Sequence, residues 1–218
     1  MIDYRNRQQE GHIITLEDPI EYVHSHKKSV VNQREVGLDT ESYDIGMKNV
    51  LRQSPDVILV GEIRDTTTME AVMAYAETGH LVLSTLHSIN ANQTLERIMQ
   101  FFPKNMESRV YAQLSLVLIA VISQRLLPTI DGEKLIPAVE IMLTSARLRE
   151  LISKGDVAAL KEVMENSTQD GMMTFDQHLL QLYKKNLITK EEALRASDSP
   201  GDLNLRMQGL TPGTVRLT

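Results

Sequence analysis

Hydrophobic residues in the first ninety positions fall into short unbroken runs, separated by polar and charged segments. The clearest run is Val-Ile-Leu-Val at residues 57–60, which a glycine and Glu62 follow directly. Such runs are typical of strands buried on both faces of a parallel sheet. Residues 12–16 and 81–86 have the same character, and residues 29–36 suit an edge strand or an extended loop. The pattern therefore predicts a small parallel sheet.

Between these runs lie amphipathic segments that carry the start and stop signals of helices. Thr40 or Ser42 is placed to cap one helix, and Asp65 or Thr66 to cap another that ends at Gly79. Strands that alternate with helices in this way are typical of an open α/β sheet.

The second half of the chain predicts mostly helix. Residues 92–102 and 104–127 are expected to form two helices, and residues 135–142 a strand. The strongly apolar stretch 114–122 is shorter than the ~20 residues of a membrane span, so a buried core helix is expected. Short amphipathic helices are expected from Thr144 onward.

Length and composition narrow the possible classes of protein. The chain has 218 residues, 42% hydrophobic and 24% charged, which is ordinary for a globular protein. Its net charge of −6 gives no overall attraction to nucleic acid or to an anionic membrane, and the absence of cysteine excludes disulfides and thiol chemistry. The charged N-terminal segment does not look like a signal peptide, so the cytoplasm is the expected compartment.

Ionisable residues follow the ends of the predicted strands. Ligands of parallel α/β sheets bind just beyond the carboxyl ends of the strands, so these side chains mark a candidate site. Phosphoryl transfer to water needs a metal ion, a carboxylate that orients water, and cations for the developing charge. Nearby guanidinium groups that suit phosphate are Arg34, Arg52 and Arg64. The candidate residues are Glu17, Asp18 and Glu21 after one strand, Glu62 after a second, and His80 and His87, which bracket a third.

Two other interpretations of the histidines remain open. His80 and His87 lie seven residues apart, so on a strand their rings point to opposite faces and share a zinc ion poorly. Either histidine is also compatible with an ordinary hydrogen-bonded group at a strand edge.

Three ordered stretches resemble the signature motifs of the secretion ATPases, the Asp box, the Walker B motif and the His box, at residues 14–21, 56–65 and 78–87. Residues 31–36 and 51–56 are similar to the type IV pilus retraction ATPases, the PilT/PilU group. Two further stretches, 90–93 and 173–177, favour the PilU side. The resemblance extends from about residue 10 to residue 200.

The resemblance implies a RecA-like P-loop ATPase core with ATP and Mg²⁺ as cofactors, followed by a mostly helical C-terminal region. By position, Glu21 resembles the catalytic acid that polarises the attacking water, and Glu62 the Walker B glutamate that holds Mg²⁺ through water. His80 and His87 resemble the histidines that couple the γ-phosphate to neighbouring subunits. The expected nucleotide-binding residues are Glu17, Asp18, Arg34, Arg64, His80 and His87.

The family also implies the setting. Its members form hexameric rings that drive pilus retraction and twitching motility at the cytoplasmic face of the inner membrane. The expected partners are further copies or a paralogous retraction ATPase and an inner-membrane pilus platform protein, without nucleic acid. The expected domains are an ATPase core at 1–130, a helical region at 131–198 and a flexible tail at 199–218.

Two departures from the family pattern matter. The Gly-rich Walker A loop with its Lys-Ser/Thr is absent, so the chain is expected to be the C-terminal portion of a larger protein. Residues 148–153 resemble the retraction motif, but Arg147 and Ser153 replace its first Ala and last Arg, which suits an accessory motor. A non-catalytic binding subunit remains an alternative. A type II secretion or pilus extension ATPase is a further one, although those commonly carry a tetracysteine zinc module and this chain has no cysteine.

Overall fold

The computed structural model describes residues 1–210, which group into two compact units. Unit 1 comprises Met1–His87 and Arg97–Val117, and unit 2 comprises Ser88–Glu96 and the described residues from Leu118 onward. These units differ from the expected ranges 1–130 and 131–198, which stay a prediction about domains.

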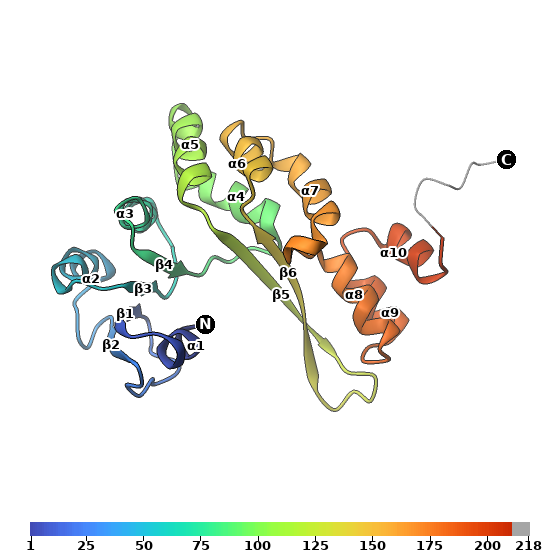
Figure 1. The fold of residues 1–218 in the computed structure, drawn as a ribbon, viewed down its shortest axis with the longest axis horizontal. Helices are drawn as coiled ribbons and strands as arrows, with labels where there is room; N and C mark the ends of the chain where they lie inside the picture. Colours follow the sequence, from blue (N-terminus) through green and yellow to red (C-terminus); the bar gives the residue numbers. More distant parts are fainter. Residues whose placement is uncertain (211–218) are drawn as a thin grey trace. The chain divides into compact units, whose positions relative to one another are not determined.

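Unit 1 is built on a four-stranded parallel sheet with strand order β2-β1-β3-β4 (Figure 1). The strands are β1 (Gly11–Glu17), β2 (Ser29–Glu35), β3 (Val57–Val60) and β4 (Leu81–Ser84). Because every pairing is parallel, the carboxyl ends of all four strands lie at one edge of the sheet. The predicted α/β sheet is confirmed, and β2 (Ser29–Glu35) forms an edge strand within the segment 29–36.

Helices cover both faces of this sheet. Ser42 caps α2 by accepting the Ile45 N–H at 3.3 Å, and Asp65 caps α3 by accepting the Thr68 N–H at 2.7 Å. Each cap satisfies a backbone donor that the first helical turn leaves unpaired. The helices of unit 1 are α1 (Ile2–Gln8), α2 (Tyr43–Val50), η1 (Leu51–Gln53), α3 (Thr66–Glu77), η2 (Lys104–Met106) and α5 (Glu107–Val117).

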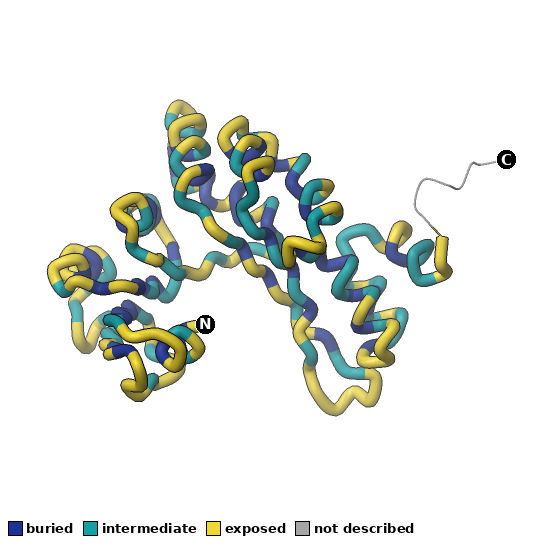
Figure 2. The backbone as a smooth tube through the Cα atoms, viewed as in Figure 1, coloured by how far each residue is buried: buried dark blue, intermediate teal, exposed yellow. Residues whose placement is uncertain are grey.

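The core of unit 1 lies on the two faces of β1 and β3 (Figure 2). Ile14 and Ile58 pack under α2 and α3, whereas Ile13 and Val57 pack on the opposite face with Ile2 of α1. Strand β4 differs from the prediction: it lies at the end of the sheet, and none of its four residues is buried. The apolar composition of β4 predicted a strand buried on both faces, and this prediction is wrong.

Unit 2 is built on an antiparallel pair, β5 (Ala120–Pro128) and β6 (Leu135–Leu143). Side chains from both strands, including Leu127 and Ala138, form a core with Phe175 and Leu179 of α8. The helices are α4 (Ala91–Met99), which crosses the boundary between the units, and α6 (Ala146–Ser153), η3 (Val157–Ala159), α7 (Leu160–Asn166), η4 (Thr168–Asp170), α8 (Phe175–Lys184), α9 (Lys190–Ala196) and α10 (Pro200–Met207).

Two predictions for this half of the chain are wrong. The expected helix over 104–127 ends at Val117, and the apolar stretch 114–122 continues into β5, where Ile122 is 53% exposed. The expected tail begins with α10, whose Leu203 is fully buried; residues 211–218 of that tail lie outside the described residues. Among residues 1–210, no helix is long and apolar enough to cross a membrane.

A buried carboxylate on β6 joins two helix starts in unit 2. Glu140 is 3% exposed and accepts the N–H of Ala91, the first residue of α4, at 2.8 Å. Burial raises the pKa of Glu140, and hydrogen bonds from the N–H groups of Ala91 and of Phe175, the first residue of α8, partly offset this. Negative charge is favoured at helix N-termini, which accounts for an acid in the core.

We expect Glu140→Ala to lower the free energy of unfolding by about 1–3 kcal/mol, because it leaves the buried Ala91 N–H without its acceptor. Glu140→Gln is the matched control, since its amide oxygen retains that hydrogen bond without charge. Because the pKa of Glu140 is raised, the wild type loses stability as the pH rises through that pKa, whereas the glutamine variant does not. Urea unfolding between pH 5 and 8 measures both effects. Equal stability of the alanine variant would contradict this role.

Candidate functional site

The carboxyl edge of the unit 1 sheet carries the acidic site. Glu62 follows β3 after Gly61, whose position leaves little space for a side chain. A Cβ at Gly61 would lie 3.1 Å from the Leu16 carbonyl oxygen and 3.1 Å from Tyr43 Oη. The close approach of β3 to β1 at this point therefore favours glycine.

Arg64 connects two of the predicted acids. Its guanidinium group forms an ion pair with the Glu62 carboxylate, and its Nη1 lies 3.4 Å from Asp18 Oδ2. The other Glu62 oxygen lies 3.1 Å from His87 Nε2, at the end of the β4 segment. The structure thus brings together residues from the ends of β1, β3 and β4, as the parallel sheet predicted.

The electrostatics of this cluster keep Glu62 negatively charged. The hydrogen bond and charge of Arg64 lower the pKa of Glu62, and the contact with His87 acts in the same direction. Glu62 in turn raises the pKa of Arg64. The side chain of Glu62 is 16% exposed, whereas that of His87 is 90% exposed and therefore accessible to a ligand.

Tyr43 extends the cluster. Its Oη is buried and has no hydrogen-bond partner among the described residues. Burial raises the pKa of Tyr43, and the negative charges of Asp18 and Glu62 add to that effect. Its hydroxyl therefore stays protonated and can donate to a further group at the edge. Nothing in the sequence distinguished this tyrosine from the others, because the fold alone brings α2 to the acids.

The acids after β1 occupy different environments. Glu17 Oε1 accepts hydrogen bonds from Thr15 Oγ1 at 2.6 Å and from Gln33 Nε2 at 3.0 Å. Asp18 is exposed apart from its contact with Arg64, and Glu21 is exposed in the segment that leads away from β1. Glu17 is therefore held within the sheet edge, while Glu21 is accessible.

Two of the predicted residues lie apart from this cluster. His80 precedes β4 and so lies at the amino edge of the sheet, where its Nδ1 is 3.2 Å from the Tyr75 carbonyl oxygen. At about 3.3 Å per residue, β4 separates it from His87 by roughly 13 Å or more. Arg34 belongs to the opposite face of β2 from its neighbours Gln33 and Glu35, because side chains alternate along a strand.

Sequence reasoning missed the two side chains of β2 that bind the Glu21 segment. Gln33 Nε2 donates to the Tyr22 carbonyl oxygen at 2.9 Å, and Glu35 Oε2 accepts the Ile20 N–H at 3.0 Å. Their spacing of two along a strand was the available signal, since it places both on one face.

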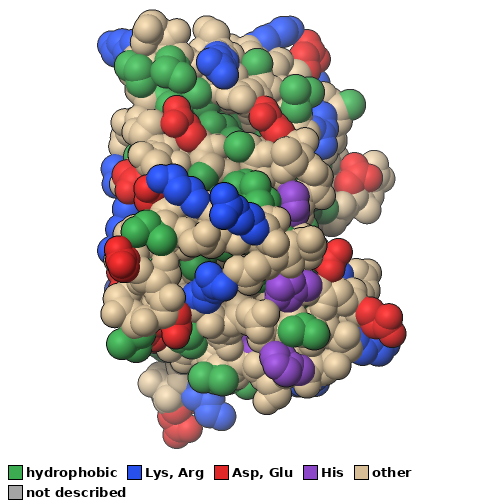
Figure 3. Space-filling model, turned by 90° about the vertical axis from the view of Figure 1, so that its left-hand side faces the viewer, with side chains coloured by type: hydrophobic (Ala, Val, Ile, Leu, Met, Phe, Trp, Pro, Cys, Tyr) green, Lys and Arg blue, Asp and Glu red, His purple; other side chains and the backbone are tan. Residues whose placement is uncertain are grey.

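The cluster fits a hydrated Mg²⁺ with a polyphosphate. Mg²⁺ is usually held by one or two carboxylates together with substrate phosphates, and Glu62 offers an ionised carboxylate at this edge. Within residues 1–210, no group of three or more histidine and acidic side chains is arranged to hold a metal ion alone. On the face drawn in Figure 3, acidic and basic side chains are interspersed.

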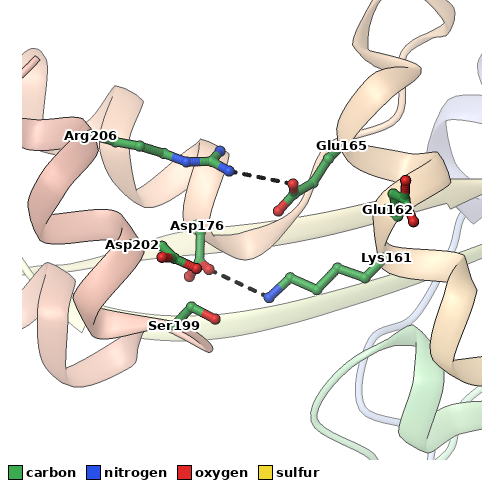
Figure 4. A pocket seen from close by; sticks show the side chains of 7 residues that line it. All are labelled: Lys161, Glu162, Glu165, Asp176, Ser199, Asp202 and Arg206. Atoms are coloured by element: carbon green, nitrogen blue, oxygen red, sulfur yellow. Dashed lines mark hydrogen bonds and ion pairs between the residues drawn. The ribbon is translucent and has the colours of Figure 1, made fainter. Parts of the chain in front are cut away.

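A separate hollow lies within unit 2 between α7, α8 and α10 (Figure 4). Its cations are already paired: Lys161 Nζ lies 3.4 Å from Asp176 Oδ2, and an Arg206 nitrogen lies 3.3 Å from Glu165 Oε2. Asp176 is 3% exposed and also accepts the Ser197 hydroxyl at 2.7 Å. We interpret this hollow as a structural ion-pair network. Its lining residues are Lys161, Glu162, Glu165, Asp176, Ser199, Asp202 and Arg206.

A parallel α/β sheet with acids, an arginine and a histidine at its carboxyl edge has its candidate ligand site where nucleotide-binding α/β folds have theirs. The family described as "Type II/IV secretion system protein" matches residues 2–195. The chain belongs to this family.

Individual relatives place the chain within the family. The type IV pilus ATPase PilU of Pseudomonas aeruginosa is 51% identical over 208 residues, which are 95% of this chain and 54% of that protein. A twitching motility protein of Neisseria gonorrhoeae is 43% identical, over 91% of this chain and 53% of that protein. The chain therefore spans about half the length of these relatives.

Among solved structures, the crystal structure of the pilus retraction motor PilT with bound ADP superposes with a TM-score of 0.85 at 46% identity. The match covers 94% of this chain and 57% of that one. The predicted RecA-like ATPase core and the similarity to the PilT/PilU group are thereby confirmed.

Proposed function

We propose that this chain supplies the acidic edge of the ATPase site in a motor subunit that drives type IV pilus retraction and twitching motility. The observation that carries the proposal is the convergence of Glu62, Asp18, Arg64 and His87 at the carboxyl edge of the parallel sheet. The similarity to pilus ATPases along nearly the whole chain supports the same activity.

Each residue has a role that suits its environment. Glu62, which stays ionised beside Arg64, would hold Mg²⁺ through water; when bound, this ion would neutralise charge on the phosphates. Glu21, exposed in the segment after β1, would accept the proton of the attacking water. The proposed nucleotide-binding set is completed by Glu17, Asp18, Arg34, Arg64 and His80. Of these, Arg34 and His80 would contact the nucleotide from surfaces apart from the cluster.

The proposed setting follows from the same similarity. The subunit would work in a ring with its own copies or with a paralogous retraction ATPase, at the cytoplasmic face of the inner membrane beneath a pilus platform protein. A PilU-like accessory role suits the altered motif on α6, where Leu148 and Ile152 are buried while Arg147 is exposed and paired with Glu150.

A non-catalytic binding subunit is the second candidate. The observation in its favour is that residues 1–218 contain no Gly-x-x-x-x-Gly-Lys-Ser/Thr run for the phosphates. A type II secretion or pilus extension ATPase is a further alternative within the enzyme class.

The test is ATP turnover by the full gene product that contains residues 1–218, alone and mixed with its paralogue. We expect Mg²⁺-dependent hydrolysis, and we expect His87→Ala to reduce turnover more than ADP affinity, because only the triphosphate offers a γ-phosphate to this exposed ring. The same loss for turnover and ADP affinity would indicate a structural histidine. No turnover in either mixture would favour the binding subunit.

A further inference from the structure

The segment that carries Glu21 has no regular secondary structure. It connects the end of β1 at Glu17 to the start of β2 at Ser29, and Glu21 is exposed near its middle. Loops of this kind are the more mobile parts of a fold. A reacting acid, in contrast, needs a defined position, since a misplacement of about 1 Å can cost ~10²-fold in rate. Some feature must therefore hold the backbone around Glu21.

Two side chains of β2 provide that support on either side of Glu21. Glu35 Oε2 accepts the N–H of Ile20, the residue before it, at 3.0 Å. Gln33 Nε2 donates to the carbonyl oxygen of Tyr22, the residue after it, at 2.9 Å. Hydrogen bonds thus hold the backbone on both sides of Glu21, while the Glu21 side chain stays accessible.

Gln33 makes three hydrogen bonds at once with its amide group. Besides the Tyr22 contact, its Nε2 donates to Glu17 Oε1 at 3.0 Å, and its Oε1 accepts the His24 N–H at 2.7 Å. Only a side chain with both donors and an acceptor can make this set. A glutamate at this position would place a negative charge against Glu17 and the Tyr22 carbonyl oxygen.

The strand that presents these side chains is itself well fixed. β2 pairs with β1 in parallel register along its whole length, and Val31 is buried against the sheet. The backbone beyond Glu35 is closed by a turn in which the Glu35 carbonyl oxygen accepts the Asp39 N–H at 2.9 Å. Gln33 and Glu35 therefore project from a strand held in the sheet onto a segment that has no strand pairing of its own.

We propose that Gln33 and Glu35 are positioning residues for hydrolysis, which hold Glu21 in place without touching the nucleotide. This rests on the proposed function of Glu21 as the acid at the attacking water. The donor of Gln33 and the acceptor of Glu35 act on opposite sides of Glu21, so removal of either loosens the segment.

The first experiment measures the backbone mobility of the Glu21 segment in the 218-residue chain, independently of ATP hydrolysis. Gln33→Met keeps the size of the side chain and removes all three hydrogen bonds, and Glu35→Ala removes the acceptor. We expect amide hydrogen exchange in residues 18–26 to become about 10-fold faster in either variant, with exchange in β1 and β3 unchanged. Glu35→Gln retains an acceptor and should behave like the wild type. Unchanged exchange in both disruptive variants would overturn the proposal.

The second experiment measures ATP hydrolysis by the full gene product. We expect Gln33→Met to lower kcat by roughly 10- to 100-fold while KM for ATP and ADP affinity change by less than about twofold. Glu35→Ala should lower kcat to a similar extent, and Glu35→Gln should retain the kcat of the wild type.

The decisive comparison uses a Glu21→Gln background. If Gln33 acts through Glu21, adding Gln33→Met there costs no further kcat. A full additional loss would show that Gln33 acts elsewhere and would contradict the proposal. If Glu21→Gln alone leaves turnover intact, the function assigned to Glu21 fails, whereas the exchange measurement still reports on the support of the segment.

Discussion

Replacing Glu21 or Glu62 by glutamine is expected to reduce ATP turnover by the full gene product about 10²- to 10⁴-fold. In the Glu21→Gln variant the attacking water loses its proton acceptor. The Glu62→Gln variant loses the carboxylate charge that would hold the hydrated Mg²⁺ and that Arg64 stabilises in the wild type. Both effects fall on the transition state, so we expect kcat to fall much more than ATP affinity.

Neither variant is expected to unfold the protein. Glu21 is exposed, and the loss of the Glu62 ion pair still leaves Arg64 with Asp18, so the change in stability should be below about 1 kcal/mol. Glu70→Gln, the same change at an exposed position on α3, is the matched control and should be fully active. Turnover within a few-fold of the wild type in both site variants would rule out the assignment.

Strands β1 and β3 of unit 1 were predictable because burial and hydrophobicity coincide in them. Ile13, Ile14 and Val57 are apolar and buried, so the unbroken runs indicated the sheet. In β5 they do not coincide: Ser123 is buried while Ile122 is exposed, so composition carries no alternating signal. An apolar stretch of that length then suits a helix equally well.

The helix α10 was missed for a different reason. Its first residue, Pro200, is followed by glycine, a pair that usually marks a loop. Proline is, however, favourable at the first position of a helix, where its missing N–H has no partner to lose. The buried Leu203 supplies the packing that stabilises so short a helix.

Part of the site followed from strand direction alone. Parallel strands bring their carboxyl ends together, which explains why Glu62 and His87 meet, whereas His80, at the amino end of β4, lies apart from them. The link from Arg64 to Asp18 spans 46 residues of sequence and depends on the fold. The same holds for the Tyr43 hydroxyl beside Gly61.

The 218-residue chain alone is expected to show no ATP hydrolysis and to bind Mg-ATP more weakly than about 1 mM. Phosphate loops offer a concave set of backbone N–H donors, a helix N-terminus and a lysine, and residues 1–218 contain no such sequence. The acidic edge cannot take its place, because Glu17, Asp18, Glu21 and Glu62 repel a triphosphate unless Mg²⁺ intervenes.

Among the described residues of the cluster at this edge, Arg64 carries the one guanidinium group, and this group already pairs with two of those acids. Arg64 would have to leave Glu62 and Asp18 to meet a phosphate, which costs the interactions that raise its pKa. Isothermal titration with Mg-ATP on the folded chain is the direct measurement, with folding checked by circular dichroism and MgCl₂ alone as the control titration. Micromolar binding of Mg-ATP would show that the nucleotide site lies elsewhere on the chain and that the acidic edge is not its centre.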